Sequence, residues 1–185
     1  MMSTYTIQPA SAMRRHVDQI PEAAGIYALL LDDPAALDGA LERANLRLDS
    51  LRLGARAILY LGATEGSLRR RLKCHLSDDT YRSTFRMSLG AVLAEQLDLK
   101  VRPNTAVRSF GFEEQSEARL SAWIAANVSV AVRTSQHAMV EEKTLIAVQD
   151  PLLNIAGRRH APSAEAVLLL RRQVRGLPFE RKCLH

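Results

Sequence analysis

The longest uninterrupted apolar run in this sequence, at residues 26–31, is only six residues long and is followed at once by Asp32, Asp33 and Pro34. A short apolar run that ends at such a turn sequence is typical of a buried β-strand. It is far shorter than the roughly 20 residues that a membrane-spanning helix needs. We therefore expect a soluble globular protein with no membrane segment. The composition, with 47% hydrophobic and 24% charged residues, agrees with this class.

Shorter apolar runs and helical repeats divide the rest of the chain into further elements. Two more strands are predicted at residues 57–61 and 128–132. Helices are predicted where apolar side chains recur every three or four positions, at residues 35–48, 68–76, 84–97, 113–127, 135–149 (capped by Ser135) and 162–175. Because the strands are few and do not alternate regularly with helices, the expected fold class is α+β.

Positive charge is concentrated in two parts of the chain. Lys and Arg total 25 against 20 Asp and Glu, which gives a net charge of +5. The first basic stretch, between residues 66 and 86, contains Arg69, Arg70, Arg71, Lys73, Arg82 and Arg86. The second, after Gly157, contains Arg158, Arg159, Arg171, Arg172, Arg175, Arg181 and Lys182. Such stretches suit a polyanion such as a nucleic acid, although an ordinary solvated surface would have the same composition.

The cysteines and the N-terminal residues indicate the compartment. Cys74 and Cys183 are too few for a disulfide framework or a zinc ribbon. Residues 1–19 are mixed and polar and lack the charged and then apolar pattern of a secretory signal. We expect a cytoplasmic protein with reduced thiols.

Several side chains with useful chemistry lie on or beside the predicted elements. Tyr27 ends a Gly-Ile-Tyr triplet on the first strand, and Tyr60 begins a Tyr-Leu-Gly triplet on the second. Arg71 and His75 are four positions apart on the next helix and therefore share one of its faces. Taken singly, each has a simpler explanation, because a tyrosine on a strand is usually a core residue and an arginine on a helix usually faces solvent.

The order of these elements resembles the GIY-YIG nuclease family. Residues 25–27 match the first motif of that family, and residues 60–62 match the second, with Leu in place of Ile. Residues 68–72 match the Leu-basic-basic-Arg-Leu helix that carries the family's catalytic arginine, which is here Arg71. His75 follows one turn later, as it does in several branches of the family.

The last part of the resemblance lies nearer the C-terminus. The family's metal-binding Glu opens a Glu-x-x-Leu-Ile stretch that is followed by Pro-x-x-Asn, and residues 142–146 and 151–154 match these two patterns. This register selects Glu142 over its neighbour Glu141. The resemblance covers residues 22–156.

The resemblance implies a small, three-stranded, mostly antiparallel sheet flanked by helices. Residues 1–156 would form the catalytic domain, with an N-terminal extension and with an inserted helix at about 35–48 that fills the long separation between the two tyrosines. Residues 157–185 would form a basic, helical C-terminal tail.

The resemblance also implies a DNA endonuclease that depends on Mg²⁺ or Mn²⁺. Glu142 would bind the metal, Arg71 would stabilise the transition state, and Tyr27 would be the general base with its pKa lowered by Arg71 and the metal. Tyr60 would position the nucleophile, and His75 would either bind a phosphate or form a hydrogen bond with a tyrosine. Supporting roles fall to Gly25, Gly62 and Asn154, and contacts with nucleic acid fall to Arg69, Arg70, Lys73, Arg158 and Arg159.

The sequence leaves other interpretations open. Ala63 replaces a lysine that often follows the second motif of the family. This departure favours an alternative, a nucleic-acid-binding module of the same fold with weak or no catalysis. A third interpretation is a structural adaptor in which the motif residues only fill the core. Retention of Glu142 argues for an enzyme, and pairing of two chains in a homodimer is left open.

Overall fold

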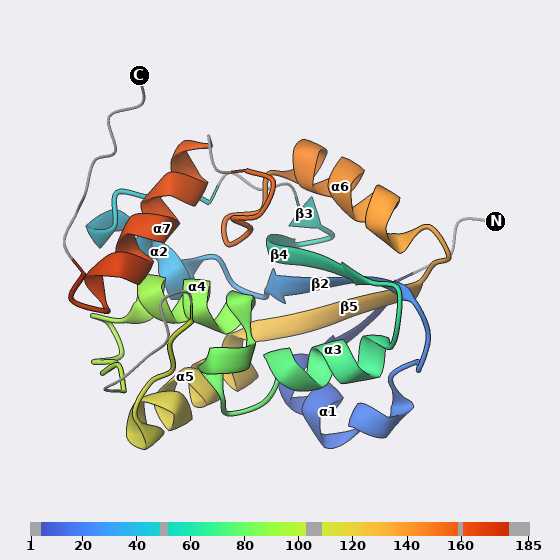
Figure 1. Cartoon of the computed structure of the whole chain (residues 1–185), viewed down its shortest axis with the longest axis horizontal. Helices are drawn as coiled ribbons and strands as arrows, with labels where there is room; N and C mark the ends of the chain where they lie inside the picture. The colour runs from blue at the N-terminus through green and yellow to red at the C-terminus, as the bar shows by residue number, and fades with distance from the viewer. Residues whose placement is uncertain (1–4, 49–51, 103–108, 159–160, 178–185) are drawn as a thin grey trace.

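A five-stranded antiparallel sheet forms the centre of the molecule in the computed structural model, which describes residues 5–48, 52–102, 109–158 and 161–177 (Figure 1). The strands are β1 Thr6–Pro9, β2 Gly25–Leu31, β3 Arg52–Leu53, β4 Arg56–Thr64 and β5 Val128–Thr134. Their order across the sheet is β1-β5-β2-β4-β3, and every neighbouring pair is antiparallel. The α+β class is therefore confirmed.

The predicted number of strands was wrong, because two strands flank the expected three. The predicted strands are β2, β4 and β5, which lie next to one another in the sheet. Strand β1 pairs with β5, with Thr6 opposite Val132, and none of its four side chains is buried. Strand β3 is two residues long. Strands this short or this exposed carry no apolar pattern, so sequence reasoning had no signal from which to predict them.

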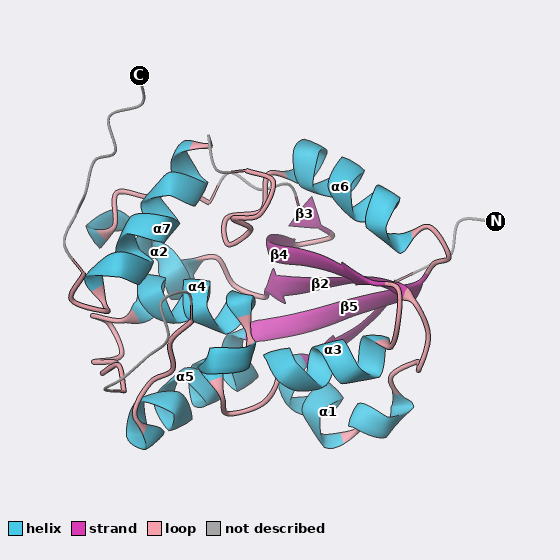
Figure 2. Ribbon diagram, in the orientation of Figure 1, coloured by secondary structure: helices cyan, strands magenta, loops and turns pink. Residues whose placement is uncertain are grey.

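Helices surround the sheet (Figure 2). Their bounds are α1 Ala10–Arg15, α2 Ala35–Arg43, α3 Leu68–His75, α4 Thr84–Leu93, α5 Glu114–Asn127, α6 Ala138–Gln149 and α7 Pro162–Gln173, with two short 3₁₀ helices, η1 Val17–Gln19 and η2 Thr80–Arg82. Helix α2 ends before the predicted limit, where Asn45 adopts a positive φ of 50°. Helix α6 begins after Ser135, whose hydroxyl accepts the backbone N–H of His137 in front of the helix. Within the described residues, none of the helices combines the length and apolar character needed to cross a bilayer.

The two faces of the sheet carry different partners. On one face, the side chains of β2 and β4 join the main core with α3, α4, α5 and α7, through residues such as Leu29, Leu72 and Phe85. On the other face, Ala28 and Ile58 belong to a second cluster that α6 covers with Leu145 and Ile146. Helices α3 and α6 therefore lie on opposite sides of the sheet, as Figure 1 shows.

The described part of the C-terminal stretch packs on the same core. Ala164 and Val167 of α7 are fully buried, and α7 lies against α4. Arg158, in the segment between α6 and α7, donates from Nη1 to the backbone oxygen of Pro151 at 2.6 Å. The domain boundary at residue 156 stays a prediction, but the core continues across it.

Candidate active site

The two motif tyrosines lie side by side because their strands are paired in the sheet. Tyr27 is opposite Gly62, and Leu29 is opposite Tyr60, so both rings project from the face that α3 covers. The ring centroids are 6.4 Å apart, with an angle of 28° between the planes. The register shifts by one residue between Leu29 and Leu30, which pair with Tyr60 and Ile58. Antiparallel register thus places two phenol groups next to each other from segments that are distant in the sequence.

The motif glycines are required by close approach. A Cβ on Gly62 would overlap the Tyr27 ring and its hydroxyl, because that ring lies directly over the Gly62 backbone. A Cβ on Gly25 would overlap the Arg133 carbonyl oxygen and would lie 2.6 Å from the Leu68 side chain. The absence of a side chain at Gly62 therefore leaves room for the Tyr27 ring, and its absence at Gly25 leaves room for helix α3 and strand β5.

Helix α3 presents Arg71 and His75 to Tyr27. Ser67 caps this helix by accepting the backbone N–H of Arg70 at 3.1 Å, and its leucine stripe is buried against the sheet. Arg71 Nε donates to the Tyr27 phenol oxygen at 3.2 Å, and His75 Nε2 lies 2.8 Å from the same oxygen. The helical spacing of four residues thus brings both side chains to one atom.

His75 is a buried neutral group. Its ring is 0% exposed, and it lies against the rings of Tyr27, Tyr60 and Phe85. Burial, followed by the charges of Arg71 and Arg86, lowers the pKa of His75 to about 3. Of the two roles predicted for His75, the structure shows the hydrogen bond to a tyrosine, and a fully buried ring has no surface with which to contact a phosphate.

This burial predicts acid sensitivity of the fold. The pKa of His75 lies near 6.5 in the unfolded chain and at about 3 in the folded chain, so between these values the unfolded state binds more protons. The free energy of unfolding should therefore fall as the pH falls from 6.5 towards 3, at up to about 1.4 kcal/mol per pH unit. Denaturant titrations between pH 4.5 and 7 would measure the slope. His75→Gln should reduce it and His137→Gln, at an exposed position, should not; equal slopes in all three proteins would contradict the burial argument.

The pKa of Tyr27 differs from the sequence-based expectation. Burial, together with the neighbouring Tyr60, raises the pKa of Tyr27 above its ordinary value of 10.0, although Arg71 opposes the shift. The expected lowering by Arg71 is thus outweighed by desolvation of the phenolate. Burial also acts to lower the pKa of Arg71, but Tyr27 and Tyr60 outweigh it, and the pKa is raised. The free protein therefore pairs a neutral phenol with a charged guanidinium.

Helix α6 approaches the same site from the other side of the sheet with Glu142. This carboxylate is half-buried, which raises its pKa, while the Ala63 backbone N–H and the charge of Arg71 act in the opposite direction. Glu141 forms an ion pair with Arg133 and accepts a hydrogen bond from Ser135 at 2.7 Å. The two neighbouring acids thus differ, because Glu142 lies towards Arg71, whereas Glu141 is bound to Arg133 and Ser135.

Asn154 stabilises the outer edge of β4 close to the tyrosines. Its Oδ1 accepts the Leu61 backbone N–H at 2.8 Å, and its Nδ2 donates to the Leu61 backbone oxygen at 2.8 Å. The Leu153 backbone N–H adds a bond to the Leu59 oxygen at 2.9 Å. The Pro-x-x-Asn segment therefore supplies the backbone partners that a further strand would provide.

The residues predicted to contact nucleic acid fall into two groups. Arg70 and Lys73 are exposed on α3. Arg69 donates to the backbone oxygens of Asp18 and Ile20 and pairs with Glu22 at 3.1 Å. Arg158 is buried, with its donors directed at its own chain, and Arg159 lies outside the described residues. The geometry thus favours Arg70 and Lys73 for contact with a ligand and gives Arg69 and Arg158 roles within the fold.

Sequence reasoning missed a polar network behind His75. Ser83 caps α4 and lies 2.7 Å from His75 Nδ1, and Tyr60 forms a hydrogen bond with Thr84 at 3.0 Å. Arg86, 1% exposed, forms a buried ion pair with Glu117 at 2.8 Å. In sequence, Arg86 is one more member of a basic stretch. A Ser that opens a helix is a recognisable cap, but nothing in the sequence connects it to His75.

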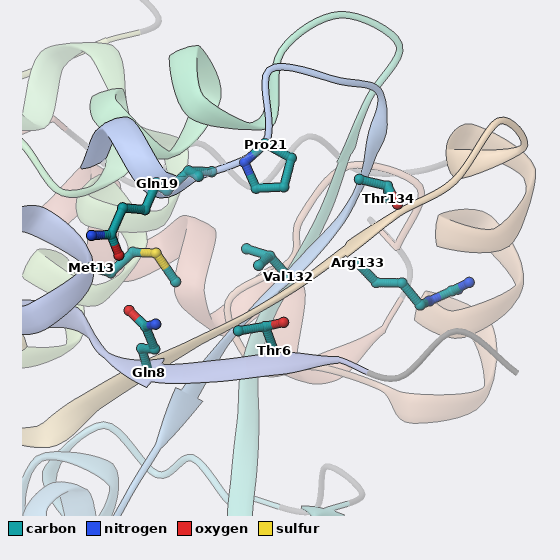
Figure 3. A pocket seen from close by; sticks show the side chains of 9 residues that line it. Thr6, Gln8, Met13, Gln19, Pro21, Val132, Arg133 and Thr134 are labelled. Atoms are coloured by element: carbon teal, nitrogen blue, oxygen red, sulfur yellow. The ribbon is translucent and has the colours of Figure 1, made fainter. Parts of the chain in front are cut away.

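A separate cavity of about 210 Å³ lies near the end of the sheet where β1 and β5 pair (Figure 3). Its lining residues are Thr6, Gln8, Met13, Gln19, Ile20, Pro21, Val132, Arg133 and Thr134. None of the five predicted catalytic residues belongs to this lining. The tyrosine cluster and this cavity are therefore distinct features of the molecule.

Comparison with known proteins agrees with this geometry. Residues 25–174 match the family described as the GIY-YIG catalytic domain, a span that includes both tyrosines, α3, Glu142, Asn154 and all of α7. Curated proteins and solved structures gave no match. The matched span covers most of the chain, and this protein therefore belongs to the GIY-YIG catalytic domain family, whose members are nuclease-type hydrolases.

Proposed function

We propose that this protein is a divalent-metal-dependent endonuclease that hydrolyses phosphodiester bonds in DNA. The observation that carries the proposal is the convergence of a guanidinium, two phenols and a carboxylate around the paired strands β2 and β4. Arg71 contacts Tyr27 directly, and the carboxylate of Glu142 lies within electrostatic range of both. These groups match the needs of phosphodiester hydrolysis, which requires an activated water and positive charge at the transferring phosphate.

Arg71 supplies the positive charge. Its side chain is half-exposed, and the bond from Nε to Tyr27 orients the planar guanidinium. A planar group with several N–H donors matches the oxygens of a phosphate undergoing substitution better than a lysine ammonium does. Arg71 therefore binds the scissile phosphate and stabilises the charge that develops on it.

The residues present fit a single Mg²⁺ or Mn²⁺ ion. Across the described ranges, no three His, Cys, Asp or Glu side chains gather into a metal-binding group, and Glu142 is the acidic residue that lies towards Arg71 and Tyr27. A lone carboxylate suits Mg²⁺, which keeps most of its water ligands. Burial disfavours the charged form of Glu142, and a bound cation would stabilise that form. When bound, such an ion supplies positive charge and a water of lowered pKa.

Tyr27 and Tyr60 act on the attacking water. Tyr27 accepts a proton only as the phenolate, and burial disfavours that form. The base role therefore depends on the positive charge next to the phenol oxygen, above all that of Arg71 at 3.2 Å. Tyr60, held by Thr84 at 3.0 Å, orients the water beside it.

Two exposed cations on α3 and a partly buried one on α7 extend the site towards a longer polyanion. Arg70 and Lys73 occupy the solvent side of α3. From the C-terminal stretch, Arg171 of α7 lies over the Phe110 ring, with Cζ 5.9 Å from the ring centroid, and interacts electrostatically with Tyr60. Such cations would hold the DNA backbone without reading its sequence.

One observation favours the alternative of a binding module with little catalysis. The raised pKa of Tyr27 leaves the proposed base protonated in the free protein, and Ala63 offers no side-chain cation in its place. Such a module would bind DNA through the same basic side chains and would leave it uncut.

Supercoiled plasmid distinguishes the two functions. We expect nicked circles with Mg²⁺ or Mn²⁺, and intact plasmid with EDTA. Glu142→Gln, purified in the same way, controls for contaminating nucleases. Binding in a gel shift without nicking at any metal concentration would support the alternative. Linear DNA that forms before nicked circles accumulate would indicate paired chains.

A further inference from the structure

Ser83 connects the active-site cluster to the start of α4. Its side chain is fully buried, and its Oγ lies 2.7 Å from His75 Nδ1. The same oxygen accepts the backbone N–H of Arg86 at 3.1 Å, which is the N-cap bond of the helix. Ser83 is therefore the only described residue that forms a hydrogen bond with the inner nitrogen of the His75 ring.

The Ser83 hydroxyl is held in place by a buried ion pair. Arg86 pairs with Glu117 at 2.8 Å, and their side chains are 1% and 5% exposed. Glu117 also accepts the Thr80 backbone N–H at 3.0 Å and the Thr80 hydroxyl at 2.8 Å, which ties η2 to α5. The turn that leads into Ser83 is thus anchored on both sides, so the position of the Ser83 oxygen beside His75 is fixed.

A count of hydrogens selects one tautomer of His75. Neutral histidine has one N–H and one bare nitrogen, and a serine hydroxyl has one hydrogen to donate. If His75 carried its hydrogen on Nδ1, it would donate to Ser83, and the Ser83 hydrogen would be sealed in the core without an acceptor among the described residues. If Ser83 donates to a bare Nδ1, the hydrogen of His75 lies on Nε2, and the hydrogen left without an acceptor among these residues is that of the Tyr27 hydroxyl. That hydroxyl lies beside the partly exposed Arg71, whereas Ser83 is fully buried, so the Nε2–H form has the smaller cost.

The Nε2–H tautomer changes what Tyr27 does. His75 Nε2–H then donates to the phenol oxygen at 2.8 Å, and Arg71 Nε donates to the same oxygen at 3.2 Å. The hydrogen of the Tyr27 hydroxyl has no further partner among the described residues. Tyr27 is 1% exposed, so this hydrogen faces no open solvent in the free protein, but it lies beside the partly exposed Arg71, from which side a bound substrate or its attacking water can accept it.

We propose that Ser83 is a positioning residue of the nuclease site, whose hydroxyl holds His75 in the Nε2–H tautomer so that Tyr27 accepts two N–H bonds and directs its own O–H towards the substrate. The proposal rests on the proposed nuclease function for its catalytic consequence. Two N–H donors already aimed at the phenol oxygen stabilise the phenolate as the proton leaves, without further reorganisation.

The tautomer can be measured without any cleavage. Long-range ¹⁵N–¹H correlation spectra of metal-free protein labelled on histidine distinguish the two neutral forms, and His75→Gln identifies the His75 signals. We expect the Nε2–H form in the wild type, loss of this preference in Ser83→Ala, and its return in Ser83→Thr, which keeps the hydroxyl. Ser67→Ala removes an equivalent cap from α3 and should leave the His75 tautomer unchanged.

Single-turnover cleavage provides the catalytic half of the test. Ser83→Ala should lose about 10-fold in rate, by analogy with the loss of the partner that orients a metal-ligating histidine, and Ser83→Thr should recover most of it. An Nδ1–H form in the wild type, or an Nε2–H form that persists in Ser83→Ala, would overturn the proposal. If no protein cleaves DNA, the nuclease function fails, and the catalytic role of Ser83 fails with it, whereas the spectra still decide the tautomer.

Discussion

Replacing Glu142 by glutamine should remove metal-dependent cleavage, with a loss of at least about 10²-fold in single-turnover rate, and leave DNA binding in place. Glutamine has nearly the same shape and can still accept the Ala63 backbone N–H, but it lacks the charge that a hydrated divalent cation requires. Binding should persist, because the exposed Arg70 and Lys73 are untouched. Cleavage of labelled duplex with enzyme in excess measures the rate, and a gel shift in EDTA measures the affinity.

Glu141→Gln is the matched control, one residue away on the same helix. That change weakens the ion pair with Arg133 and the hydrogen bond with Ser135, so it should affect stability more than chemistry. Near wild-type cleavage by Glu142→Gln would eliminate Glu142 as the metal ligand. A severe defect in Glu141→Gln alone would move that role by one residue.

Arg71→Ala should also lose about 10²-fold or more in rate, as expected when a group that stabilises transition-state charge is removed. Arg71 Nε contacts Tyr27, so the variant loses both the cation and the donor that holds the phenol oxygen. Arg71→Lys should recover only part of the rate, because an ammonium cannot reproduce the fork of donors. Single-turnover rates, with folding checked by circular dichroism, measure the effect.

Arg70→Ala is the matched control for this substitution. Arg70 is the adjacent residue on α3, about 100° away around the helix axis, and is exposed to solvent. Its loss should weaken DNA binding, most visibly as salt is raised, and leave the rate at saturating enzyme close to that of the wild type. Equal rate defects in Arg70→Ala and Arg71→Ala would mean that α3 is only a cationic surface.

Local pattern predicted the central elements closely. The apolar run that begins at Gly25 is β2, with all seven residues buried, and the leucine stripe from Leu68 is α3. These elements bury one face or both, so their apolar spacing is visible in sequence. Strand β1 has no buried residue and β3 has only two residues, so neither shows an apolar pattern. Their places in the sheet are determined by pairing with β5 and β4.

The family resemblance predicted a site made of Tyr27, Tyr60, Arg71, His75 and Glu142, because each matches a motif position on a strand or helix that the apolar pattern reveals. The structure brings these side chains near one another, and their catalytic roles stay predictions. The tertiary structure decided which of the basic residues form hydrogen bonds within the fold, since Arg69 and Arg158 donate to backbone oxygens of their own chain. It also decided the protonation of the cluster. Burial lowers the pKa of His75 and raises that of Tyr27, and their contact joins positions 48 residues apart. Charge and residue type are written in the sequence, whereas desolvation and distance exist only once the chain has folded.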